Sequence, residues 1–162
     1  MTRDEFLLRD FLTEWLYPHF VQGSLRIRTE QLWPYLRALH EQGLVAEQWK
    51  ESTLKRVSSE LLRIAVDFGL MRGAVMREFT TYHLPEKSLI YLLHAMREVQ
   101  PNARDVVHSP DWHMFRMDAA DVERELFRLH QYRRVHYEVA GSLAQLELPC
   151  ESAATYALEM VA

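Results

Sequence analysis

The chain has 162 residues, a net charge of −4, 48% apolar or aromatic residues and 26% charged residues. This length suits one domain, and the composition excludes a disordered chain, which would be poor in aliphatic and aromatic residues. The acidic balance excludes a chain coated with basic residues, and no apolar run approaches the roughly 20 residues that a membrane helix needs. The single cysteine, Cys150, cannot form an internal disulfide, so we expect a cytoplasmic protein.

Two helices are expected in the first quarter of the chain. Over residues 4–17, Leu7, Phe11 and Trp15 recur at helical spacing, and Pro18 follows as a stop signal. A second helix is expected over residues 29–42. Its leucines mark one apolar face, while a proline near its start implies either a late start or a kink.

The clearest helix covers residues 53–68, with Ser52 or Thr53 as its N-cap. Its apolar residues make a continuous stripe along one face, and Gly69 ends it. The residues then change character, and the β-branched and aromatic residues within 70–82 suit a short hairpin better than a helix. We interpret this hairpin as a wing.

The second half of the chain repeats this order. Residues 85–99 are apolar nearly all round, which is typical of a central buried helix, and a loop opens at Pro101. A helix-start signal follows at residues 109–111. Asp118 and Asp121 then form a capping arrangement before a helix over residues 119–132.

A second hairpin and a last helix complete the expected elements. Residues 135–139 and 143–148 are predicted strands on either side of Gly141-Ser142, a two-residue turn with glycine first. Residues 152–161 form a short helix. We therefore expect a mainly α fold with two short β-hairpins, arranged as a single compact domain over residues 1–162.

A helix that follows a shorter helix and leads into a two-stranded hairpin resembles the winged-helix branch of the helix-turn-helix proteins. The resemblance implies two winged-helix-like units, over residues 1–100 and 101–162, packed as one domain. The helices at 53–68 and 119–132 would hold the recognition position. No residue-level repeat accompanies the two halves, so any duplication would be of architecture only.

Charge is distributed unevenly along the chain. Residues 50–77 include six basic and three acidic residues, a local balance of +3, so the remainder sums to −7. If the first unit binds double-stranded DNA, the basic face of the helix over residues 53–68 would lie against the duplex, and the wing would reach adjacent phosphates. The alternative is a solvated helix face whose charges serve solubility. The predicted nucleic-acid-binding residues are Lys50, Thr53, Lys55, Arg56, Ser59, Arg63, Arg72 and Arg77.

Four short segments carry a more particular resemblance. TLKRV (53–57), DFGL (67–70), YLL (91–93) and GSL (141–143) are similar to parts of small accessory proteins encoded in bacterial phage-exclusion (BREX-type) operons. The resemblance implies a DNA-associated, non-enzymatic helper in phage defence.

Known catalytic and metal-binding signatures are not found. The eight histidines occur without a Cys-x-x-Cys or His-Glu-x-x-His motif. There is also no Gly-x-Ser-x-Gly elbow and no glycine-rich phosphate loop. We therefore expect a protein that is not an enzyme and that holds no metal or cofactor. A convergent active site, assembled by the fold from residues distant in sequence, is the weakest of the alternatives.

A protein partner is the second alternative. Trp49 lies in a polar stretch and is a candidate partner anchor, and Arg133 and Arg134 are candidate contacts in the second unit. The acidic net charge and the many aromatic residues would suit an adaptor or scaffold subunit of a larger complex, or a homodimer.

Overall fold

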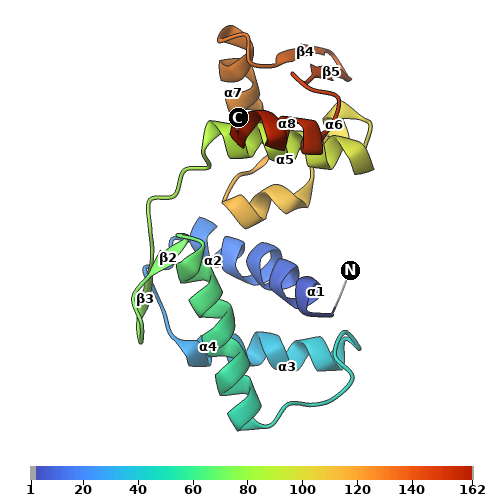
Figure 1. Ribbon diagram of the computed structural model, residues 1–162. Coiled ribbons are helices and arrows are strands. Elements are labelled where there is room, and N and C mark those ends of the chain that lie inside the picture. Colours follow the sequence, from blue (N-terminus) through green and yellow to red (C-terminus); the bar gives the residue numbers. More distant parts are fainter. Residues whose placement is uncertain (1–2, 162) are drawn as a thin grey trace. The chain divides into compact units, whose positions relative to one another are not determined.

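The structure is a computed structural model that describes residues 3–161, with side chains from residue 6 onward, and the chain divides into two compact units (Figure 1). The units are Met1–Tyr82 and His83–Ala162. Each is mostly helical and contains a small antiparallel sheet, so the predicted mainly α fold with short hairpins is confirmed. The sequence placed the start of the second unit at residue 101, whereas the structure divides at 82–83 because α5 (Glu86–Val99) packs against α6 (Ala103–Val107) and α8 (Ala153–Val161).

The first unit begins with one long helical stretch. It consists of α1 (Arg3–Asp10), a π-helical segment (Phe11–Leu16) and α2 (Tyr17–Val21). The prediction that Pro18 stops the helix is wrong. The backbone N–H of Tyr17 donates to the carbonyl of Leu12, five residues back, and Pro18, which has no N–H, follows in the first turn of α2, where no donor is needed.

A three-stranded sheet follows in the same unit. Its order is β1 (Arg26–Ile27), β3 (Arg77–Phe79) and β2 (Met71–Arg72), all antiparallel. The predicted hairpin is confirmed as β2 and β3, whereas β1 was not predicted because a two-residue strand has no readable periodicity.

Two helices lie between β1 and β2. A 3₁₀ turn (Thr29–Leu32) leads into α3 (Trp33–Glu41), the late start that Pro34 implied, and α4 spans Glu51–Asp67. The predicted N-cap, Ser52 or Thr53, is wrong by two or three positions, because Lys50 is already the extended residue before the helix. The unit is held together by large apolar side chains with little or no exposure: Phe11, Leu16, Ile27, Leu32, Leu36, Leu54, Leu62, Leu70 and Met71.

The second unit starts with α5 and the short α6, in which the side chain of Asn102 accepts a hydrogen bond from the N–H of Arg104. The sequence indicated only a loop at α6. A 3₁₀ segment (Pro110–Phe115) leads to α7 (Ala119–Gln131), and the Asp118–Asp121 capping box is confirmed, with hydrogen bonds in both directions.

The second hairpin consists of β4 (His136–Ala140) and β5 (Leu143–Glu147), joined by Gly141-Ser142 as predicted. Helix α8 then packs against α5 (Figure 1), where the carboxylate of Glu98 accepts a hydrogen bond from the N–H of Ala153 at 2.9 Å. The buried core of this unit includes Leu89, Leu93, Val106, Trp112, Val122, Leu126, Leu129 and Tyr137. Within residues 3–161, no helix combines the length and apolarity needed to cross a membrane.

Candidate nucleic-acid interface

Helix α4 presents two chemically different faces. Leu54, Leu61, Leu62 and Ala65 are buried against the rest of the first unit, which follows from their helical spacing. The opposite face therefore points to solvent, and it includes Lys55, Arg56 and Arg63, half of the basic residues predicted to bind nucleic acid.

Three of the predicted cations lie at the N-terminal end of α4. Lys50 precedes the first turn, and Lys55 and Arg56 follow in the second; all three are exposed. None of them forms an ion pair with another residue whose side chain the structure describes. Thr53 and Ser59, the predicted polar neighbours, are half-buried. Glu51 is the one acidic residue in the first two turns of α4, so these three cations leave a net positive charge at a helix N-terminus, which itself favours anions.

The C-terminal half of α4 is different, because carboxylates offset its arginine. Arg63 lies 2.7 Å from the carboxylate of Glu60 and 3.6 Å from that of Asp67. The hydrogen bond to Glu60 and the charges of both carboxylates raise the pKa of Arg63. The spacings of three and four residues along a helix could have predicted this compensation.

The sheet adds a cross-strand pair of arginines. Glu78 on the central strand is the register partner of both Arg26 and Arg72, and its two carboxylate oxygens lie 3.3 and 3.2 Å from their guanidinium groups. Both arginine side chains remain largely exposed. Arg72 was predicted, whereas Arg26 was missed because β1 and its register with β3 are decided by the tertiary structure.

Arg77 does not extend outward from the hairpin as the sequence analysis expected. Side chains alternate along β3, so Glu78 faces outward while Arg77 is only 7% exposed. Burial lowers the pKa of Arg77, and its Nε has no hydrogen-bond partner among the described residues. We therefore leave Arg77 out of the candidate interface.

Helix α7 of the second unit has basic residues that are largely compensated. Arg124 pairs with Asp121, and Arg128 lies 2.9 Å from Glu125 and 3.3 Å from Glu86. The predicted partner contacts follow this helix: Arg134 is 3.4 Å from Glu86, and Arg133 is exposed without an ion pair to the described side chains. Trp49, the third predicted partner contact, is half-buried in the first unit.

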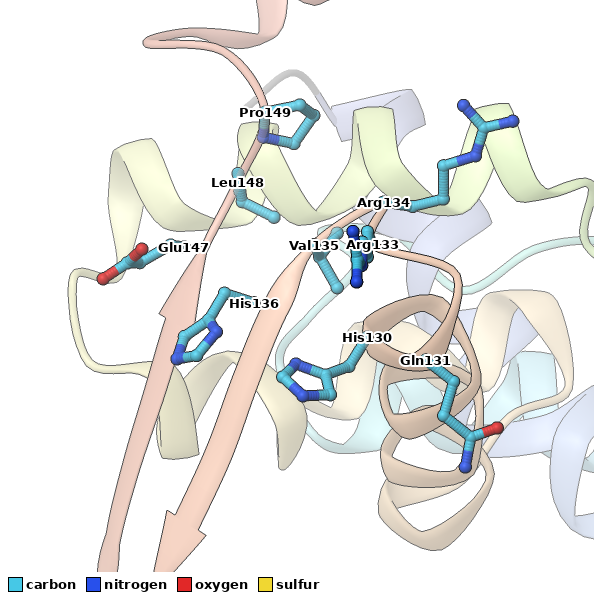
Figure 2. Close-up of a pocket in the computed structure, with 9 residues that line it drawn as sticks. All are labelled: His130, Gln131, Arg133, Arg134, Val135, His136, Glu147, Leu148 and Pro149. Carbon is cyan, nitrogen blue, oxygen red and sulfur yellow. The ribbon is translucent and has the colours of Figure 1, made fainter.

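A hollow of about 720 Å³ opens at the C-terminal end of α7, beside the start of β4 and the end of β5 (Figure 2). His130 and His136 lie side by side in its lining, with ring centroids 5.1 Å apart. Sequence reasoning did not connect this histidine pair with the arginines at 133 and 134. Among the residues whose side chains are described, no three His, Cys, Asp or Glu come together as a metal site would require.

Comparison with known families matches residues 1–95 to the family described as BrxA, which is more than half of the 162 residues. The match covers the whole first unit, including α4 and the three-stranded sheet, and reaches into α5. Neither the curated proteins nor the solved structures gave a match. The match agrees with the resemblance to BREX-type accessory proteins, and the chain therefore belongs to the BrxA family, with a role in a BREX phage-defence system.

Proposed function

We propose that this protein is a non-enzymatic accessory subunit of its defence system that binds double-stranded DNA through the first unit. The N-terminal end of α4 contacts the duplex, and the sheet contacts the flanking backbone. The observation that carries the proposal is the set of three exposed cations, Lys50, Lys55 and Arg56, that have no carboxylate partner among the described side chains.

The order of elements supports the same proposal. The first unit runs helix, β1, α3, α4, β2, β3, with β3 between the other two strands. This order resembles that of a winged-helix unit, in which the helix before the hairpin would read the major groove with residues near its N-terminus. Helix α4 occupies that position, and the three exposed cations are at that end.

The distribution of charge between the units points the same way. The first unit has 11 basic and 11 acidic residues, whereas the second has 8 basic and 12 acidic residues. Within the neutral first unit, Glu60, Asp67 and Glu78 compensate arginines away from the N-terminal end of α4. At that end Lys50, Lys55 and Arg56 outnumber Glu51, so a local excess of positive charge remains there and would attract phosphate groups.

Binding is tested by titrating a fluorescent duplex at several salt concentrations. With about four phosphate contacts, affinity should fall about a hundredfold between about 50 and about 200 mM salt. The double variant Lys55→Glu with Arg56→Glu should bind more weakly and should reduce the slope of log affinity against log salt by about 2.

A matched control carries the same change of charge in the second unit. Lys87→Glu with Arg124→Glu alters two exposed helical residues, on α5 and α7, and should leave the affinity close to that of the unchanged chain. No binding of the unchanged chain at low salt would remove the proposal. Equal losses in the two double variants would do the same, because they would mean that only net charge matters.

A further inference from the structure

The hollow at the C-terminal end of α7 has a cationic lining that the proposed DNA contact does not use. Arg133, Arg134, His130 and His136 are among its lining residues, and the guanidinium of Arg134 points away from the two imidazoles (Figure 2). Glu147 is the one carboxylate among its lining residues. Two arginines against one lining carboxylate leave a positive balance, which favours an anionic ligand over a cationic one.

Arg133 is held in an unusual backbone conformation at this hollow. Helix α7 ends in a Schellman motif, in which the N–H of Arg133 donates to the carbonyl of His130 and the N–H of Arg134 donates to that of Leu129. Arg133 takes the left-handed position, with φ at 55°. The same motif after α2, α3 and α4 has glycine at this position: Gly23, Gly43 and Gly69.

An arginine in this position costs backbone strain that a glycine would avoid. The guanidinium of Arg133 is exposed and forms no ion pair with the described side chains. Arg134, in contrast, is already engaged by the carboxylate of Glu86 at 3.4 Å. Arg133 is therefore the lining cation with its charge available to a ligand.

The histidines supply a directed donor beside this cation. The backbone N–H of Tyr137 donates to Nδ1 of His130 at 3.1 Å, so the neutral ring has its hydrogen on Nε2. His136 lies beside it, with its Nε2 at 3.4 Å from the carboxylate of Glu138. His130 is thus fixed as a hydrogen-bond donor on one side of the hollow.

We propose that this hollow is a binding site for a phosphate monoester, with Arg133 as the principal contact and His130 as a hydrogen-bond donor. A guanidinium offers paired N–H donors that match two phosphate oxygens, and the imidazole N–H can donate to a third. The apolar side chains of Val135, Leu148 and Pro149 border the same hollow and would contact the organic part of the ester.

The site is tested in the full chain by NMR, with inorganic phosphate, AMP and adenosine as separate probes. Phosphate and AMP at millimolar concentration should shift the imidazole signals of His130 and His136, whereas adenosine, which lacks the phosphate, should not. A tighter response to AMP than to phosphate would assign part of the affinity to the apolar border. Equal shifts with AMP and adenosine, or no shift with phosphate and AMP, would overturn the proposal.

Arg133→Gly separates ligand binding from folding. Glycine suits a φ of 55°, so this variant should melt at the same temperature as the unchanged chain or higher, while its response to phosphate and AMP is lost. Arg116→Gly is the matched control, since Arg116 has a φ of 56° and does not line the hollow. It should keep the response. Retention of the response in Arg133→Gly, or its loss in both variants, would overturn the assignment to this hollow.

Discussion

His94 is a buried residue of α5, only 3% exposed, and α5 packs against α8. Its ring stacks on Tyr156 at 5.3 Å, and its Nε2 has no hydrogen-bond partner among the described residues. Burial lowers the pKa of His94, and the nearby carboxylate of Glu98 opposes part of that shift. The folded protein therefore holds this ring neutral under conditions in which a free histidine would gain a proton.

The consequence is a loss of stability in acid. As the pH falls below about 6.5, the ordinary histidine pKa, the unfolded chain binds a proton at His94 before the folded chain does. The free energy of unfolding of the second unit should therefore decrease, with a slope from this residue no steeper than about 1.4 kcal/mol per pH unit. Above about pH 6.5, His94 should contribute no pH dependence to the free energy of unfolding.

Urea unfolding, followed by amide signals of the second unit in NMR, measures this effect. His94→Phe keeps an aromatic ring against Tyr156 but cannot titrate, so it should have a flatter dependence on pH than the unchanged chain. Parallel pH profiles for the two proteins would show that another group is responsible.

At the scale of elements, the β2–β3 hairpin depends on Gly73. Its φ is 103°, and a Cβ at this position would overlap the backbone carbonyl oxygen of Met76. The turn therefore requires glycine for two reasons, backbone conformation and space. The hairpin places Arg72 and Glu78 in register, so its geometry also decides where the exposed arginines of the sheet lie.

Gly73→Ala should lower the stability of the first unit by more than about 1 kcal/mol, because backbone atoms must move to admit the Cβ. Gly141→Ala in the other hairpin is the control: its φ is 60°, and no heavy atom lies within 4 Å of the added Cβ. It should cost about 1 kcal/mol or less, from conformation alone. Urea unfolding of the unit that contains each substitution compares the two losses of stability, and equal losses would contradict the steric argument.

Several elements were readable from local sequence. The apolar spacing in α4, the capping aspartates before α7 and the glycine-first turn between β4 and β5 each depend on residues close in sequence. Strand β1 and helix α6 were not readable, because two to five residues are too few for a period to appear. The first helix continues through Pro18 because a π-helical segment precedes it, and no residue pattern predicts that segment.

At the scale of the whole molecule, each unit has a core of its own. Large buried side chains such as Phe11 and Leu62 lie in the first unit, and others such as Trp112 and Leu126 lie in the second. Hydrogen bonds between residues distant in sequence also tie elements together inside the second unit, as between Arg97 and Leu146 or Glu98 and Ala153. The units are therefore expected to fold separately.

A fragment of residues 1–82 tests this expectation together with the location of the DNA contact. It should unfold cooperatively, with modest stability because a domain of this size buries only about 60% of its unfolded surface. It should also keep the salt-dependent affinity of the full chain, since the proposed contacts lie within it. A folded fragment without affinity would place the DNA contact elsewhere, whereas an unfolded fragment would refute independent folding alone.

The sequence by itself determined the helical class, the two hairpins and the excess of positive charge between residues 50 and 77, because periodicity, turn residues and charge counts are local properties. Which cations keep that charge exposed was decided only by the tertiary structure. Strand register brought Glu78 between Arg26 and Arg72, and side-chain alternation buried Arg77. The cationic hollow beside His130 likewise exists because folding brings the end of α7 against β4 and β5.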